Sequence, residues 1–278
     1  MKKLVLWSAA AALLYLFMFL LIPKSEDAPD MYSTNVLKAQ TYMSQRDNCE
    51  LVVVGSSMAA ELNLPDDDDS CCNLAFFGGC SLTGLKLIVE KGRLYGLYPD
   101  TVIVEMNNTI ENGTDDDIIK KTSGFDYLLI NRIENRPDYL FYSLIKSLRN
   151  KKEKSLYDAP VIKERIDYWT EARSVETDQD LLNAKMDEAL NYCRLLKQNG
   201  VRIVIMEPPN DASLYDLPQT RQVRETALKF FPEAEYEWFT VDWNDYVVSD
   251  GLHMGNLSSR KYSDLLLQRY KPGVAAQP

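Results

Sequence analysis

Histidine is almost absent from this sequence of 278 residues, and cysteine is sparse. The only histidine is His253, and the five cysteines form no C-x-x-C pair and have no metal-ligand spacing with it. This scarcity argues against a metal centre built on cysteine and histidine. Because five is an odd number, at least one thiol is free or paired with another chain. A disulfide from Cys49 to either Cys71 or Cys72 is open to a chain that lies outside the cytoplasm.

The chain also has a deficit of basic residues. It contains 31 lysines and arginines against 41 aspartates and glutamates, which gives a formal net charge of −10. An acidic surface repels phosphate backbones and anionic lipid surfaces, so the composition argues against nucleic-acid binding and against membrane docking through basic residues. Hydrophobic residues make up 46% and charged residues 26%, as in folded globular proteins.

One long apolar run occupies the N-terminus, from Leu4 to Ile22, after Lys2 and Lys3. As a helix it would measure roughly 28 Å at about 1.5 Å per residue, close to the roughly 30 Å of a bilayer core. No small-residue cleavage site follows the run, which favours an uncleaved anchor at 1–23 over a cleaved signal peptide. The two lysines predict a single-pass membrane protein with its N-terminus inside and the rest of the chain extracytoplasmic.

Short apolar runs alternate with helical patterns from Cys49 onwards. Expected strands lie at 51–54, 72–76, 101–106, 201–206 and 239–241, and expected helices at 82–98, 178–198 and 257–270. This alternation predicts an α/β domain over 49–278: a three-layer α/β/α sandwich around a flavodoxin-like parallel sheet of about five strands. No internal repeat is present.

Two segments fall outside this alternation. Residues 24–48 are polar and predict a linker or stalk with a helix at about 33–45, whereas 107–176 predict a mostly helical insertion. The tyrosines of the insertion, such as Tyr127, Tyr139 and Tyr142, suit either sugar stacking or core packing. The run Asp66–Asp69 lacks the spacing and glycine of a known calcium loop, so a solvated loop is the better interpretation.

Chemistry-bearing residues follow the predicted strands, where active sites of open α/β sheets collect. Ser57 comes just after the first strand and Gly55, at the expected start of a helix, although a turn with a helix cap would also explain Gly-Ser-Ser. His253 is the one possible histidine base for a serine nucleophile. Asp250 lies three residues before it and can orient the imidazole, whereas Asp242 and Asp245 lack that spacing.

Four segments, in order, resemble the four sequence blocks of the SGNH/GDSL hydrolase family. V-V-V-G-S-S at 52–57 resembles the first block and places Ser57 as the nucleophile. N-L-A-F-F-G at 73–78 resembles the second, whose glycine, Gly78 here, gives an oxyanion N–H. D-G-L-H at 250–253 matches the fourth. The resemblance covers about 49–270 and implies a catalytic triad of Ser57, His253 and Asp250.

The third block departs most from the family pattern. V-I-V-E-M-N-N at 102–108 lacks the glycine and aspartate of G-x-N-D, so either Asn107 or Asn108 is left as the asparagine donor to the oxyanion. In the first block, Ser56 replaces the aspartate that usually precedes the nucleophile. The departures leave open a catalytically weak scaffold or binding protein in cell-surface polysaccharide assembly.

The resemblance implies a serine esterase or O-acyltransferase that works through an acyl-serine, with no cofactor and no metal. Its expected substrate is an acylated envelope carbohydrate or another ester, and envelope-polymer assembly proteins are possible partners. Hydrolysis and transfer share one triad, so the residues do not separate them.

Overall fold

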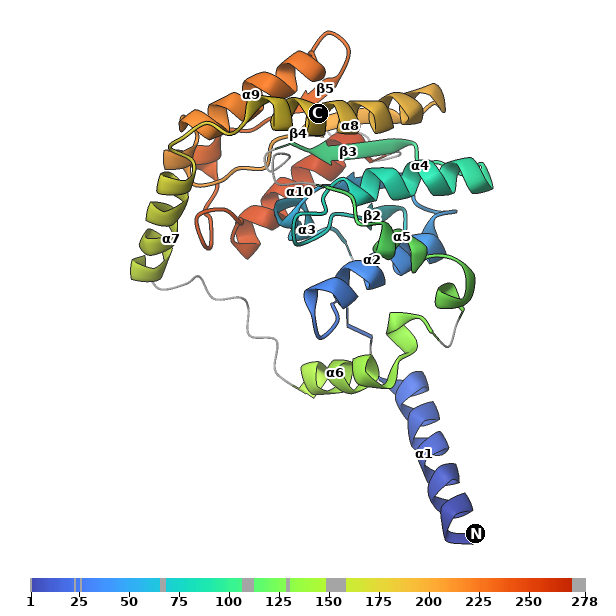
Figure 1. The fold of residues 1–278 in the computed structure, drawn as a ribbon. Coiled ribbons are helices and arrows are strands. Elements are labelled where there is room, and N and C mark those ends of the chain that lie inside the picture. The colour runs from blue at the N-terminus through green and yellow to red at the C-terminus, as the bar shows by residue number, and fades with distance from the viewer. Residues whose placement is uncertain are drawn as a thin grey trace. The chain divides into compact units, whose positions relative to one another are not determined.

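The computed structural model describes residues 2–22, 24–25, 27–65, 69–106, 113–128, 131–148 and 159–271. The chain divides into two compact units. Residues 1–41 and 117–153 form one, which we call the N-terminal unit, and residues 42–116 and 154–278 form the other, which we call the sheet unit. Figure 1 shows the elements of both.

The sheet unit is built on five parallel strands in the order β2-β1-β3-β4-β5. The order 2-1-3-4-5 is that of flavodoxin-like folds, whose ligands bind at the carboxyl ends of the strands. The sheet confirms the predicted α/β class with an all-parallel sheet. The strands are β1 (Leu51–Val54), β2 (Cys71–Asn73), β3 (Thr101–Glu105), β4 (Arg202–Met206) and β5 (Glu237–Phe239).

Two strands, β2 and β5, differ from the prediction by more than one residue. β2 ends at Asn73 rather than at residue 76, although the Leu74 and Phe76 N–H groups still donate to the Val53 and Gly55 carbonyls, at 2.8 and 2.9 Å. β5 begins at Glu237 and ends at Phe239, where 239–241 was expected. Its pairing with β4 aligns Met206 with Phe239, and the chain leaves the sheet beyond that pair.

Helices cover both faces of the sheet, which agrees with a three-layer arrangement (Figure 1). α3 (Ser57–Ala60) and α10 (Asn256–Tyr270) pack on the face that carries Leu51, Val53 and Ile103. The helices of the other layer pack side by side: α4 (Thr83–Tyr95), α8 (Gln179–Gln198) and α9 (Pro218–Phe230). β1 is buried along its whole length, as expected for a parallel strand covered on both faces.

The described part of the predicted 107–176 insertion is helical, but it is shared between the two units. α7 (Ala159–Ala172) belongs to the sheet unit. α5 (Asp116–Lys120) begins at the boundary, and the N-terminal unit holds two 3₁₀ turns, η2 (Gly124–Tyr127) and η3 (Ile133–Asn135), and α6 (Pro137–Leu148). The helix expected in the linker is present as α2 (Met31–Gln45).

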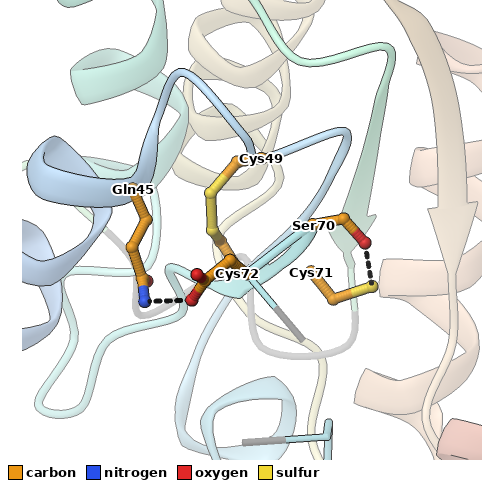
Figure 2. The surroundings of a disulfide bond; sticks show 6 residues. Gln45, Cys49, Ser70, Cys71 and Cys72 are labelled. Atoms are coloured by element: carbon orange, nitrogen blue, oxygen red, sulfur yellow. Dashed lines mark hydrogen bonds between the residues drawn. A yellow bond between two sulfur atoms is a disulfide. The ribbon is translucent and has the colours of Figure 1, made fainter. Parts of the chain in front are cut away.

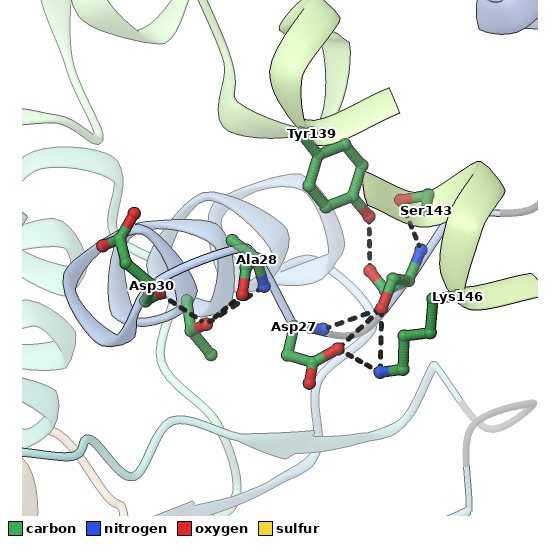
Figure 3. A network of polar contacts seen from close by, with 8 residues as sticks. Asp27, Ala28, Asp30, Tyr139, Ser143 and Lys146 are labelled. Atoms are coloured by element: carbon green, nitrogen blue, oxygen red, sulfur yellow. Dashed lines mark hydrogen bonds and ion pairs between the residues drawn. The ribbon is translucent and has the colours of Figure 1, made fainter. Parts of the chain in front are cut away.

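Polar contacts in the N-terminal unit join α6 to the segment that follows α1 (Lys2–Leu21). The Tyr139 hydroxyl donates to the Ser25 carbonyl, and Lys146 forms an ion pair with Asp27 (Figure 3). The Ser25 N–H donates to the Ser143 hydroxyl at 3.4 Å. Since Tyr139 is buried and bonded in this way, core packing describes it better than sugar stacking.

The apolar run at the N-terminus forms α1, most of whose large apolar side chains are exposed. Within the residues that the structure describes, no helix is long and apolar enough to cross a membrane. The spanning anchor at 1–23 has no support there and stays a prediction from the sequence.

A disulfide joins Cys49 to Cys72, which settles the alternative that the sequence left open (Figure 2). Successive side chains of a strand point to opposite faces, so Cys72 meets Cys49 while Cys71 turns into the hydrophobic core under α10. Cys71, Cys80 and Cys193 are free and buried. The bond spans a sequence separation of 23 residues and ties β2 to Cys49, two residues before β1.

Candidate active site

The turn between β1 and α3, which we call the elbow (residues 55–57), presents Ser57 at the carboxyl edge of the sheet. Ser56 is the N-cap of α3, and its hydroxyl accepts a hydrogen bond from the Met58 N–H at 3.3 Å. Gly55 has a φ of +153°, and a side chain there would collide with Glu105 at the end of β3. Ser57 therefore begins a helix directly after a buried strand, as the sequence predicted.

The structure brings Ser57, His253 and Asp250 into one chain of hydrogen bonds. His253 Nε2 lies 2.9 Å from Ser57 Oγ, and His253 Nδ1 lies 2.9 Å from Asp250 Oδ2. Ser57 and His253 are 196 residues apart in the sequence, so the fold creates this contact. The side chains of His253 and Asp250 are 18% and 14% exposed, which leaves the group reachable from solvent yet largely desolvated.

The Asp250 carboxylate has several donors that favour its ionised form. Burial alone would raise its pKa, but the hydrogen bonds from the His253 ring and backbone N–H outweigh burial and lower the pKa to about 2. Oδ1 accepts the N–H groups of His253 at 2.8 Å and Leu252 at 3.1 Å. Asp250 is therefore a carboxylate at neutral pH and directs a proton onto His253 Nδ1, which leaves Nε2 to accept from Ser57.

A tight loop, residues 249–253, carries both Asp250 and His253; we call it the acid–base loop. The Ser249 N–H and hydroxyl both donate to the His253 carbonyl, at 2.7 and 3.1 Å. Gly251 has a φ of +88°, a left-handed conformation that favours glycine, and a side chain there would press on Ile166 of α7. These constraints hold the conformation of the loop that carries the acid and the base.

Side chains from α7 and its C-terminal end support the acid–base loop. Arg165 Nη1 lies 3.4 Å from Asp250 Oδ2. Arg173 Nη1 donates to Asn210 Oδ1 at 2.8 Å, and Asn210 Nδ2 donates in turn to the Leu252 carbonyl at 3.2 Å, in the amide orientation that satisfies both neighbours. Both Arg173 and Asn210 are buried. Sequence reasoning missed these supports, because α7 lies in the predicted insertion and nothing local links it to residue 250.

Gly78 lies in the loop that follows β2. Gly78 and Gly79 have φ values of +77° and +73°, and the Gly79 carbonyl accepts the Gly113 N–H at 2.9 Å. Among the described residues, neither the Gly78 N–H nor the Ser57 N–H has a hydrogen-bond acceptor. Both donors therefore remain available to an oxyanion, while Asn107 and Asn108, predicted as alternative third donors, lie outside the described residues.

Asn73 supports the elbow from the neighbouring strand. Its amide Nδ2 donates to the Ala59 carbonyl of α3 at 2.9 Å, and its Oδ1 accepts the Ala75 N–H at 3.1 Å. One side chain thus joins the end of α3 to the start of the loop that leads to Gly78. The asparagine of the second sequence block therefore has a structural role that can be read directly from its contacts.

The described residues contain no group of three or more histidine, cysteine, aspartate or glutamate side chains placed to hold a metal ion. Three of the four residues in the acidic run at Asp66–Asp69 lie outside them. A scan against protein-family models gives no match for this chain. A search of curated proteins gives none either.

Proposed function

We propose that this protein is a serine-dependent acyl-ester hydrolase or O-acyltransferase of the SGNH type. The observation that carries the proposal is the continuous hydrogen-bonded chain Ser57–His253–Asp250, with both contacts at 2.9 Å, at the carboxyl edge of a parallel sheet. A nucleophile, a base and an orienting acid within hydrogen-bond reach are the requirements of nucleophilic acyl transfer. The order of the four sequence blocks supports the same assignment.

The reaction follows from the protonation states of the three groups. His253 Nε2 takes the Ser57 proton while Ser57 Oγ attacks the ester carbonyl carbon, and the ionised Asp250 stabilises the imidazolium that forms. The tetrahedral intermediate collapses, the C–O bond to the alcohol breaks, and His253 returns the proton to the leaving oxygen. Water or an acceptor hydroxyl then attacks the acyl-serine by the reverse sequence, which gives hydrolysis or transfer.

Two backbone donors are assigned to the oxyanion, the N–H groups of Ser57 and Gly78. Each such donor stabilises the transition state by about 2.7–4 kcal/mol in enzymes of this chemistry. The third donor in this proposal is the amide of Asn107 or Asn108. No cofactor or metal enters the proposed steps, because the proton and the acyl group are handled by side chains and backbone alone.

We also propose that the sheet unit lies outside the cytoplasm, attached to the membrane through residues 1–23. Two features support the location: the lysines before the apolar N-terminal segment, and the Cys49–Cys72 disulfide, since such bonds persist in oxidising compartments. An acylated envelope carbohydrate is the substrate class that fits this location. Envelope-polymer assembly proteins are the proposed partners.

Labelling by a fluorophosphonate tests the enzymatic proposal. The probe should attach to the purified protein at Ser57, and Ser57→Ala should lose the label completely, because the Ser57 hydroxyl is the group proposed to be activated by the His253 ring. Ser213→Ala is the matched control, since Ser213 is an exposed serine of the same unit and should leave the labelling rate unchanged. A wild-type protein that is folded and never labelled would favour the scaffold alternative, a binding protein for polysaccharide assembly.

A further inference from the structure

A buried glutamate lies beside the elbow. Glu105 is the last residue of β3, and its side chain is on the same face of the sheet as Ile103 because strand residues alternate. The residue is only 3% exposed. Glutamate is among the residue types least often fully buried, so its place next to a candidate nucleophile calls for a physical reason.

The Glu105 carboxyl group contacts the backbone of the elbow. Oε2 accepts the Ser56 N–H at 2.7 Å, at the short end of the range for such a bond. Gly55 makes this approach possible, because a Cβ at residue 55 would lie 2.5 Å from Glu105 Cβ and 2.8 Å from Oε2. Glu105 can therefore reach the Ser56 N–H only because residue 55 is a glycine.

The elbow has no acidic side chain of its own to hold it. Ser56 stands directly before the nucleophile, and its hydroxyl caps α3 at the Met58 N–H. The peptide that follows Ser56 carries the Ser57 N–H, one of the proposed oxyanion donors. A rotation of the elbow would move this N–H and Ser57 Oγ together, and a displacement of about 1 Å can cost on the order of 100-fold in rate.

We propose that Glu105 is a positioning residue for Ser57, acting by accepting the Ser56 N–H and thereby fixing the direction of the Ser57 N–H and Oγ. The inference rests on the proposed function and deepens it. The proposal gives a role to the third sequence block at 102–108, which departs most from the family pattern. Glu105 lies in this block, at the end of β3. Because Glu105 is assigned to act through the backbone of the elbow, its effect should fall on kcat rather than on KM.

The chain offers a matched control in Glu207, which follows β4 as Glu105 ends β3. Glu207 is also buried, but its carboxylate pairs with Arg224, whose Nε lies 2.9 and 3.0 Å from the two oxygens. Burial raises the pKa of the Tyr262 hydroxyl, and the charges of Glu207 and Glu105 raise it further. Glu207 differs in that its carboxylate bonds to a side chain of α9, whereas the Glu105 carboxylate bonds to the backbone of the elbow.

The experiment compares Glu105→Ala, Glu105→Asp, Glu105→Gln and Glu207→Gln, each checked for folding by circular dichroism and thermal unfolding. Activity is followed with a small activated ester and by the fluorophosphonate labelling rate. Glu105→Gln keeps an acceptor oxygen at the same reach and should stay within about threefold of wild type. Glu105→Asp is too short, and it and Glu105→Ala should lose about tenfold to 100-fold in kcat with KM unchanged.

Glu207→Gln should lower the thermal midpoint and leave the rate per folded molecule unchanged. Glu105→Asp or Glu105→Ala at the wild-type rate would overturn the proposal, and so would a folded Glu105→Gln as impaired as Glu105→Asp. If Glu105→Ala fails to fold, the comparison of Glu105→Gln with Glu105→Asp still tests the proposed role of Glu105. A wild-type protein that neither labels nor turns over would instead count against the proposed function, so the two failures are distinguishable.

Discussion

The two halves of the candidate site, the elbow and the acid–base loop, are held by different means. The elbow is held by neighbouring strands: it follows the buried β1 directly, Asn73 reaches α3 from β2, and Glu105 reaches the Ser56 N–H from β3. The acid–base loop depends on more remote supports, above all α7 and the residues after β4. The nucleophile is thus supported by residues of the sheet strands, whereas the loop that carries the acid and the base is supported by α7 and the segment after β4.

The largest change is expected from Asp250→Asn, which breaks the acid–base loop at its functional centre. An amide accepts a hydrogen bond from His253 only through one atom, and it does not stabilise the imidazolium, so kcat should fall by about 10³- to 10⁴-fold. Steady-state kinetics with an activated ester measures the loss. A fall of less than about tenfold would mean that another group orients His253.

The same variant has a pH signature in stability. The pKa of Asp250 is lowered from 3.8 to about 2, so its ionised form stabilises the fold at pH values above about 4, and this contribution is lost as the pH falls towards 2. Urea unfolding of wild type and Asp250→Asn should therefore show a gap in stability that narrows over that interval. A gap that stays constant with pH would contradict the assigned pKa.

A smaller effect is expected when the remote support is removed and the triad itself is kept. Arg173→Ala leaves the buried Asn210 amide without its donor, which should cost about 1–3 kcal/mol in the free energy of unfolding. Because Asn210 holds the Leu252 carbonyl, kcat should also fall, by about tenfold. Chemical denaturation and steady-state kinetics on one preparation measure the free energy of unfolding and kcat. An unchanged kcat would show that the acid–base loop keeps its conformation without the Arg173–Asn210 contact.

The sequence predicts the residues of the triad but not the residues that support them. Ser57, Asp250 and His253 carry local signals, since each follows an apolar strand or sits at a short fixed spacing. Glu105, Asn210 and Arg173 act through contacts between distant parts of the chain, such as the 49 residues that separate Ser56 from Glu105, and no local pattern reveals them.

The smallest effect on activity is expected from the disulfide, which lies at the amino end of β1, away from the elbow. Cys49→Ser with Cys72→Ser should lower the free energy of unfolding by about 3 kcal/mol, given the 23-residue loop, and leave kcat within about twofold. Cys193→Ser controls for the loss of a buried thiol. A large loss of kcat in the folded double variant would show that the two edges of the sheet are coupled.

The central claim, that Ser57 forms a covalent acyl intermediate with His253 as its base, is tested most directly by trapping that intermediate. The protein is mixed with a slowly deacylated activated ester, quenched in acid, digested and examined by mass spectrometry. The account predicts an acyl group on the peptide that contains Ser57, absent from Ser57→Ala and strongly reduced in His253→Ala. An acyl group on another residue, or a turnover that continues at full rate in folded Ser57→Ala, would contradict it.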